Sequence, residues 1–377
     1  MNARITVLPG DGIGPEVTQQ AVRVLRAVAA VFDYQFEFCE HAIGGAAIDV
    51  TGSPLSADTL GACRDSHAIL LGAVGGPKWN DTSRAQRPEA GLLALRQRLG
   101  LFANIRPVKP TSVAARSSPL KAEIIRDVDL IVVRELTGGI YFGQKSRSED
   151  EASDVCTYRR PEVERIVRLA ASLASGRRGK VTSVDKSNVL ETSRLWREIT
   201  DEIVAREFAQ LQLEHLLVDA AAMHLLTRPS SFDVIVTENM FGDILTDEAS
   251  VLAGSIGMLP SASMGATMTD LGTFGVYEPI HGSAPSLVGS NVANPFGAIL
   301  SAAMLLRWSL RLEEAAILIE RAVEAVIASN VLTPDLGGSA STSDVGDRVV
   351  DHITRAPERL LEAGSARGAT SLDVRIA

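Results

Sequence analysis

The sequence predicts an α/β protein with two lobes. Its 377 residues exceed what one hydrophobic core usually supports, so the chain is expected to divide. Short apolar runs alternate with segments of helical periodicity along the chain, which is typical of a largely parallel sheet covered by helices. These two observations set the fold class.

The elements follow in order. Buried strands are predicted at 5–8, 68–72, 130–133, 181–184 and 232–236, and amphipathic helices at 16–30, 161–174 and 312–328. In the second helix, Pro161 stands at a plausible first turn and apolar residues recur at helical spacing. The segments 72–77 and 281–295 are rich in Gly, Pro and small residues, which favours ligand-binding loops. Apolar periodicity fades over 356–377, and its end is expected to be a weakly ordered tail.

Composition excludes several classes of function. The net charge is −9 and there is no run of Lys or Arg, which argues against a nucleic-acid partner or an anionic membrane surface. Cys39, Cys63 and Cys156 are far apart and form no C-x-x-C pair, as expected for small buried side chains in a reducing compartment without structural zinc. The N-terminus does not resemble a signal peptide, and the apolar stretch 298–306 is too short to span a bilayer. We therefore expect a cytoplasmic protein.

A carboxylate pair follows the strand predicted at 232–236. Asp243 and Asp247 are four positions apart, so they share one face if the segment is helical. Oxygen ligands of this kind suit Mg²⁺ or Mn²⁺. On spacing alone, two solvated carboxylates near a helix N-terminus are the better interpretation.

Other candidates carry charge or a transferable proton. Arg96, Arg106 and Arg134 could bind carboxylates through bidentate forks, and Arg134 closes a buried strand. Lys186, also at a strand end, could act as a base, and Tyr141 as an acid. Each of the five taken alone is more often a structural or salt-bridged residue.

A phosphate-binding loop is not obvious. The opening GDGIGPE at 10–16 places its third glycine one position early, with Pro15 where a dinucleotide fingerprint needs glycine. The small-residue loop 281–285 (HGSAP) is a better candidate, because it can expose backbone N–H groups.

Several blocks together resemble the β-decarboxylating dehydrogenases, which act on isocitrate, 3-isopropylmalate, homoisocitrate and tartrate. These blocks are LPGDGIGPEV from Leu8, VRELTGGIYFG at 133–143, VDKSNVLETSRLWR at 184–197, NMFGDILTDEAS at 239–250 and EPIHGSAP at 278–285. Four of them hold candidates named above, and the likeness extends to the PDLGGSA segment at Pro334. The resemblance to the isopropylmalate branch is close, and it favours the functional interpretation of each candidate over the structural one.

The resemblance implies the fold and the roles of residues. The fold would be the two-lobed one of this family, unlike the Rossmann fold, with residues 1–101 and 254–364 in a cofactor-binding lobe, 102–253 in a dimerisation lobe and 365–377 as a tail. Arg96, Arg106 and Arg134 would bind substrate carboxylates, Tyr141 would donate a proton and Lys186 would accept one. Asp219 would join Asp243 and Asp247 around Mg²⁺ or Mn²⁺ and would also contact substrate. In the family's homodimers, Lys186 and Asp219 reach into the neighbouring site.

The nicotinamide dinucleotide would bind on the first lobe. The residues implied are Gly76, Glu89, Glu278, His281, Gly282, Ser283, Ala284, Pro285, Ser286, Leu287 and Asn294. The loop 76–89 would line the nicotinamide. Members of the isopropylmalate branch usually carry Asp after HGSAP, where this chain has Ser286, and Asn291 replaces a common Gly. NAD is expected because no Lys or Arg replaces that Asp, while NADP stays open.

The substrate's third substituent is indicated by Glu89, Leu92 and Leu93. The family resemblance places this stretch beside that substituent, and the two leucines offer apolar surface without positive charge. We therefore expect oxidative decarboxylation of 3-isopropylmalate in leucine biosynthesis. Two alternatives are the same reaction on another 3-substituted malate, and a non-catalytic regulatory subunit.

Overall fold

The computed structural model describes residues 1–79, 86–111 and 113–356. It divides into two compact units, each described by itself. The first comprises Met1–Gly100, Thr111–Ser117 and the described part of Gly254–Ser371, and the second comprises Leu101–Pro110 and Ser118–Ala253. The expected tail at 365–377, residues 357–364 and part of the expected nicotinamide loop (80–85) lie outside the described residues.

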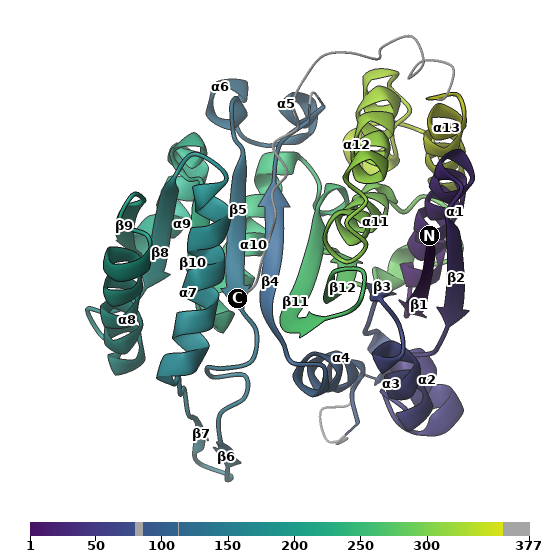
Figure 1. Ribbon diagram of the computed structural model, residues 1–377. Helices are drawn as coiled ribbons and strands as arrows, with labels where there is room; N and C mark the ends of the chain where they lie inside the picture. The colour runs from purple at the N-terminus through teal and green to yellow at the C-terminus, as the bar shows by residue number, and fades with distance from the viewer. Residues whose placement is uncertain (80–85, 112, 357–377) are drawn as a thin grey trace. The chain divides into compact units, whose positions relative to one another are not determined.

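The first unit is a sheet covered by two layers of helices (Figure 1). Its strands lie in the order β2-β1-β3-β12-β11, and all neighbours are parallel except β11 and β12. Helices α1 and α11 pack against the sheet, and α12 and α13 pack on those two helices. The strands are β1 (Asn2–Gly10), β2 (Gln35–Glu40), β3 (Ala68–Ala73), β11 (Pro260–Met268) and β12 (Thr273–Pro279). The helices are α1 (Gly14–Phe32), α2 (Gly45–Thr51), α3 (Ala57–Arg64), α4 (Pro88–Arg98), α5 (Ala114–Ser117), α11 (Phe296–Trp308), α12 (Glu313–Ala328) and α13 (Thr342–Thr354).

The short helix α5 belongs to the first unit, although the sequence interpretation placed 102–253 together in the second. The reason is local packing, because α5 lies against the 3₁₀ turn Pro334–Leu336. The Ser117 hydroxyl reaches the Leu336 carbonyl at 3.5 Å.

The second unit holds the strand order β4-β5-β10-β8-β9, in which only β4 and β5 are antiparallel. The strands are β4 (Leu101–Val108), β5 (Leu130–Glu135), β8 (Lys180–Asp185), β9 (Gln212–Leu217) and β10 (Val234–Thr237), and β6 (Lys145–Arg147) and β7 (Ala152–Asp154) form a separate hairpin. The helices are α6 (Ala122–Ile125), α7 (Arg160–Ser175), α8 (Glu191–Glu207), α9 (Val218–Thr227) and α10 (Asn239–Ser250). Because β5, β10, β8 and β9 are parallel, their carboxyl ends share one edge of the sheet.

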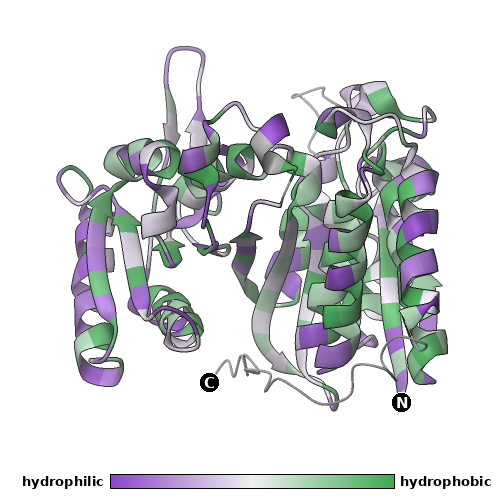
Figure 2. Cartoon of the chain, turned by 90° about the horizontal axis from the view of Figure 1, so that it is seen from above, coloured by the Kyte–Doolittle hydropathy of each residue, from purple (hydrophilic) through white to green (hydrophobic). Residues whose placement is uncertain are grey.

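Burial explains why these segments form these elements. The strands β3 and β5 are buried along their whole length, as parallel strands covered on both faces must be. Several of the longer helices carry hydrophobic and hydrophilic residues on different faces (Figure 2). The five predicted strands and three predicted helices are confirmed, with ends that differ by up to three residues. No helix among the described residues is both long and apolar enough to cross a membrane.

Candidate active site

Helix α10 presents the carboxylate pair. It begins directly after β10, where the Glu238 carboxylate accepts a hydrogen bond from the Phe241 N–H (2.6 Å) and caps the first turn. Asp243 and Asp247 follow one turn apart, and both side chains are partly exposed. Partial burial raises the pKa of Asp247; Arg106 opposes this rise and the Asp243 carboxylate adds to it. The helix proposed from spacing is therefore present, with both carboxylates on one face.

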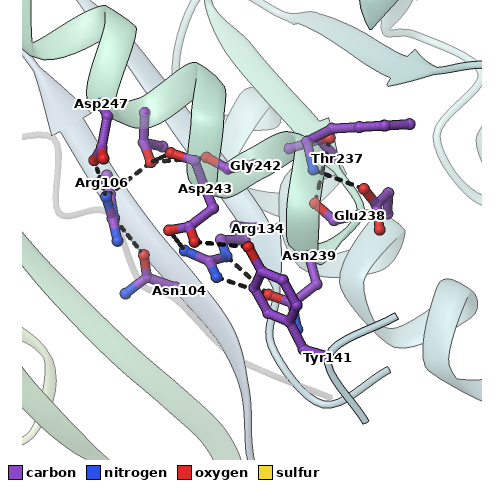
Figure 3. A network of polar contacts seen from close by, with 12 residues as sticks. Asn104, Arg106, Arg134, Tyr141, Thr237, Glu238, Asn239, Gly242, Asp243 and Asp247 are labelled. Atoms are coloured by element: carbon purple, nitrogen blue, oxygen red, sulfur yellow. Dashed lines mark hydrogen bonds and ion pairs between the residues drawn. The ribbon is translucent and has the colours of Figure 1, made fainter. Parts of the chain in front are cut away.

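Arg134 and Tyr141 converge on Asp243 (Figure 3). Arg134 Nη1 donates to Asp243 Oδ1, and the Tyr141 hydroxyl donates to Asp243 Oδ2 at 3.0 Å. The Arg134 guanidinium also lies 5.9 Å from the centre of the Tyr141 ring. Burial, followed by the charge of Asp243, raises the pKa of Tyr141 to about 12. The phenol is therefore protonated at neutral pH.

Arg106 reaches the same helix from β4. Its Nη1 donates to Thr246 Oγ1 at 2.7 Å, and it lies 3.6 Å from Asp247 Oδ1. Its Nε donates to Asn104 Oδ1 at 2.6 Å. Two of the three predicted carboxylate-binding arginines, Arg106 and Arg134, thus lie beside the acidic face of α10.

Lys186 and Asp219 form a second pair. Lys186 follows β8 and Asp219 opens α9, so both stand at carboxyl ends of parallel strands. Lys186 Nζ donates to Asp219 Oδ1 at 2.5 Å, and this hydrogen bond lowers the pKa of Asp219. Both side chains are accessible to solvent.

The three predicted metal ligands do not meet within one chain. Among the described residues, no three His, Cys, Asp or Glu side chains are grouped so as to hold a metal ion. Asp243 and Asp247 offer two hard oxygen ligands on one face, which fits part of a Mg²⁺ or Mn²⁺ shell. Asp219 is paired with Lys186 instead.

In the first unit, α4 aligns the residues predicted to face the substrate's substituent. Glu89, Leu92, Leu93 and Arg96 are spaced i, i+3, i+4 and i+7, so they share one face of the helix. Arg96 Nη2 donates to Glu278 Oε1 at 2.7 Å, and both side chains are buried. Arg96 Nε is buried without a hydrogen-bond partner. An unsatisfied guanidinium nitrogen is costly to bury, so this group suits an incoming anion.

The predicted cofactor loop is anchored to the start of the chain. The Ile13 N–H donates to the Ser283 carbonyl (2.8 Å), and the Gly289 N–H donates to Glu16 Oε1 (2.7 Å). Ser286 and Leu287 are exposed in the 3₁₀ turn Pro285–Leu287 that follows Ala284, and Gly282 is exposed before it. The opening GDGIGPE motif therefore anchors this loop.

His281 and Asn294 flank this loop. Burial lowers the pKa of His281, whose Nε2 is buried without a partner. Asn294 Oδ1 accepts from the Phe296 N–H at 2.9 Å, and its Nδ2 donates to Asp335 at 2.9 Å. Both ends of Asn294 are thus engaged in structural contacts, in addition to the cofactor role predicted for it.

Sequence reasoning missed residues that support the site. Asp11 accepts hydrogen bonds from the N–H groups of Gly45, Ala46 and Gly75 at 2.7–2.8 Å and so ties two loops together, next to Gly76. Asn239 contacts Arg134 and is treated below. Both lie within blocks quoted from the sequence, Asp11 in LPGDGIGPEV and Asn239 at the start of NMFGDILTDEAS, but no role was assigned to either.

Comparison with known proteins assigns the chain to a family. Residues 4–349 match the family model described as isocitrate/isopropylmalate dehydrogenase. The chain is 56% identical over 359 residues to the 3-isopropylmalate dehydrogenase of Rhodopirellula baltica, covering 93% of this chain and 99% of that one. It is 55% identical over 349 residues to the 3-isopropylmalate dehydrogenase of Bacillus subtilis, covering 91% and 94%.

Solved structures of related dehydrogenases have a similar fold. The crystal structure of isocitrate dehydrogenase from Methylococcus capsulatus has a TM-score of 0.82 at 34% identity, covering 93% of this chain and 99% of that one. That of a beta-decarboxylating dehydrogenase from Thermococcus kodakarensis has a TM-score of 0.77 at 36% identity, covering 97% and 100%. With the family model matching most of its length, the chain belongs to the isocitrate/isopropylmalate dehydrogenase family.

Proposed function

We propose that the chain is an NAD-dependent 3-isopropylmalate dehydrogenase of leucine biosynthesis. It would convert (2R,3S)-3-isopropylmalate to 4-methyl-2-oxopentanoate and CO₂. The observation that carries the choice of substrate is the face of α4, where Leu92 and Leu93 lie between Glu89 and Arg96. Two apolar side chains suit an isopropyl group and leave a third carboxylate, as in isocitrate, without a cationic partner. The relatives named 3-isopropylmalate dehydrogenase support the same substrate.

The arginines would bind the substrate through its carboxylates. Arg106 and Arg134 lie beside the acidic face of α10, and Arg96 carries a buried nitrogen that needs an acceptor. Guanidinium forks hold planar carboxylates in one orientation, which reduces the entropy lost on the way to the transition state. Arg106 and Arg134 would offer such forks in the second unit, and Arg96 would offer one in the first.

Asp243 and Asp247 would hold a divalent ion, Mg²⁺ or Mn²⁺, together with Asp219 from a second copy of the chain. When bound, such an ion supplies a Lewis acid for the 2-hydroxyl and for the negative charge that develops during decarboxylation. Asp219 would also contact substrate, because it would stand next to the chelated hydroxyl. This arrangement supports a homodimer with shared sites.

Proton transfers would fall to Lys186 and Tyr141. As hydride leaves C2 for the nicotinamide ring, Lys186 would accept the hydroxyl proton, directly or through water. The resulting β-keto acid breaks the bond between C3 and its carboxylate, releasing CO₂ and leaving the electron pair on the enolate. Tyr141, whose hydroxyl already donates to Asp243, would then protonate C3.

NAD would bind along 282–294 with His281, Glu278 and Gly76 nearby. Neither Lys nor Arg stands beside Ser286 in the turn Pro285–Leu287, so the turn offers no cation for a 2′-phosphate. This favours NAD over NADP.

The test is NADH formation by the purified chain supplied with 3-isopropylmalate, NAD and Mg²⁺. Chelation of the metal and the Asp243→Asn variant should each abolish turnover. Folded, metal-loaded protein that forms no NADH would overturn the proposal.

A further inference from the structure

Two buried asparagines each accept hydrogen bonds from one of the predicted substrate-binding arginines of the second unit, Arg106 and Arg134. Asn104 Oδ1 accepts from Arg106 Nε at 2.6 Å, and Asn239 Oδ1 accepts from Arg134 Nε and Nη2 at 3.0 and 2.8 Å. Asn239 is 1% exposed and Arg134 is 4% exposed. A neutral acceptor on one edge of a guanidinium fixes its plane without neutralising its charge.

Asn239 is the more connected of the two. Its Nδ2 donates to the Gly138 carbonyl at 3.2 Å, so the amide bridges the end of β5 and the turn that leads to Tyr141. Only one orientation of the amide satisfies both contacts, because the arginine requires an acceptor and the carbonyl requires a donor. Figure 3 shows the amide of Asn239 beside the guanidinium, which reaches Asp243 with its other end.

The backbone of Asn239 is held as firmly as its side chain. Its N–H donates to the Tyr158 hydroxyl at 3.0 Å, and that hydroxyl donates to Glu238 Oε2 at 3.1 Å. The Tyr158 ring packs so closely on the turn that a Cβ at Gly139 would lie 2.4 Å from its hydroxyl oxygen. Asn239 is therefore held through both its backbone and its side chain, so it offers the Arg134 guanidinium an acceptor at a fixed position.

We infer that Asn239 is a positioning residue for the reaction proposed above. It holds the Arg134 fork in the plane that receives a substrate carboxylate, and it couples this plane to the turn bearing Tyr141. The inference rests on the proposed function for the identity of the substrate. In this proposal Asn239 does not contact the substrate, so its effect on substrate binding must pass through Arg134.

A double-mutant cycle tests whether Asn239 acts through Arg134. Binding of 3-isopropylmalate with Mg²⁺ is measured by calorimetry without NAD, so that no turnover occurs. Asn239→Ala should raise the Kd on the order of 10-fold or more, as removal of an orienting partner typically does. In an Arg134→Met background the same change should alter the Kd less than about twofold, because the group that Asn239 orients is gone.

Two controls separate positioning from folding. Asp233→Asn weakens a buried ion pair with Arg177 (2.8 Å) at the opposite end of β10, and it should lower the melting temperature while leaving the Kd for 3-isopropylmalate within about twofold. Asn239→Ser keeps a small acceptor and serves if the alanine variant unfolds. If both variants at 239 unfold, the residue maintains the fold and the proposal is overturned.

The outcomes distinguish the two proposals. No binding of 3-isopropylmalate by the wild-type chain would overturn the proposed function. Wild-type binding with equal losses from Asn239→Ala in both backgrounds would overturn only the role of Asn239.

Discussion

Asp243 is contacted by two other predicted site residues of the second unit. It accepts from Arg134 and from Tyr141, and it shares a helix face with Asp247. One carboxylate thus orients a cation and a proton donor, each through a different oxygen. The other predicted functional pair, Lys186 and Asp219, lies at the carboxyl ends of β8 and β9.

Lys186→Ala should lower kcat by on the order of 10²- to 10⁴-fold, the usual contribution of a general base. Binding of NAD should be nearly unchanged, because the expected cofactor loop lies in the other unit. Steady-state NADH formation and NAD titration measure the two quantities. A kcat within about twofold of wild type would contradict the role given to Lys186.

His281 should make stability fall at acid pH. Burial lowers its folded-state pKa below the ordinary value of 6.5, so below that pH the unfolded chain binds a proton that the folded chain resists. The stability from neutral His281 is therefore present above about pH 6.5 and is lost as the pH falls through the lowered folded pKa. Urea unfolding of wild type and His281→Asn at pH 7 and pH 5 checks this, and the wild type should lose more stability. An equal loss in both proteins would show that burial of His281 has no such effect.

The supporting residues show why part of the site could not be predicted. Arg134, Lys186 and Asp243 stand at strand ends or at helical spacing, so local pattern and resemblance together identified them. Asn239 meets Arg134 from 105 positions away, and nothing local distinguishes it from a capping residue. Such contacts exist only after the strands have paired.

At the scale of elements, we propose that α4 decides which substrate is accepted. Its apolar pair, Leu92 and Leu93, is half-buried and flanked by Glu89 and Arg96. A helix carries such a set rigidly, because its backbone groups are bonded within the helix. Selectivity would then follow from two side chains rather than from the loop beside them.

Leu93→Ala should reduce kcat/KM for 3-isopropylmalate by about 10-fold to 200-fold relative to unsubstituted malate, which lacks the isopropyl group. Leu92→Ala should act in the same direction. Gln97→Ala is the matched control, because Gln97 is exposed on the same helix. Equal losses on both substrates would show that these leucines stabilise the protein without contacting the substituent.

Some elements were missed because they show no clear hydrophobic period. The strands of the hairpin β6–β7 are exposed along their whole length, so they show no apolar alternation. Helix α11 was missed for the opposite reason, because it is buried on nearly every side and has no polar face. Only the apolar stretch 298–306 was noticed in it.

At the scale of the whole molecule, the predicted catalytic groups are divided between two units. The second unit carries Lys186, Tyr141 and the three aspartates, and the first carries α4 and the expected cofactor loop. Large apolar side chains are exposed beside the functional pairs, namely Met223 on α9, Ile244 on α10 and Val189 after Lys186. Apolar groups in this position support the homodimer proposed above.

Mixing two inactive variants tests whether sites are shared. If Lys186 of one copy serves Asp243 of another, a mixed dimer of Lys186→Ala and Asp243→Asn chains has one intact site. Co-refolding at equal amounts should then restore about a quarter of wild-type activity, because half of randomly formed dimers are mixed. No recovery from properly folded dimers would show that each site is built by one chain.

The central claim is oxidative decarboxylation of 3-isopropylmalate with NAD. The most direct measurement is kcat/KM of the wild-type chain for 3-isopropylmalate, isocitrate, malate and tartrate, each with Mg²⁺ and with NAD or NADP. We predict the highest value for 3-isopropylmalate with NAD, at least about 10-fold above the other malates, as expected for an apolar substituent in an apolar site. A higher value for isocitrate, or for any substrate with NADP, would contradict the roles given to Leu92, Leu93 and Ser286.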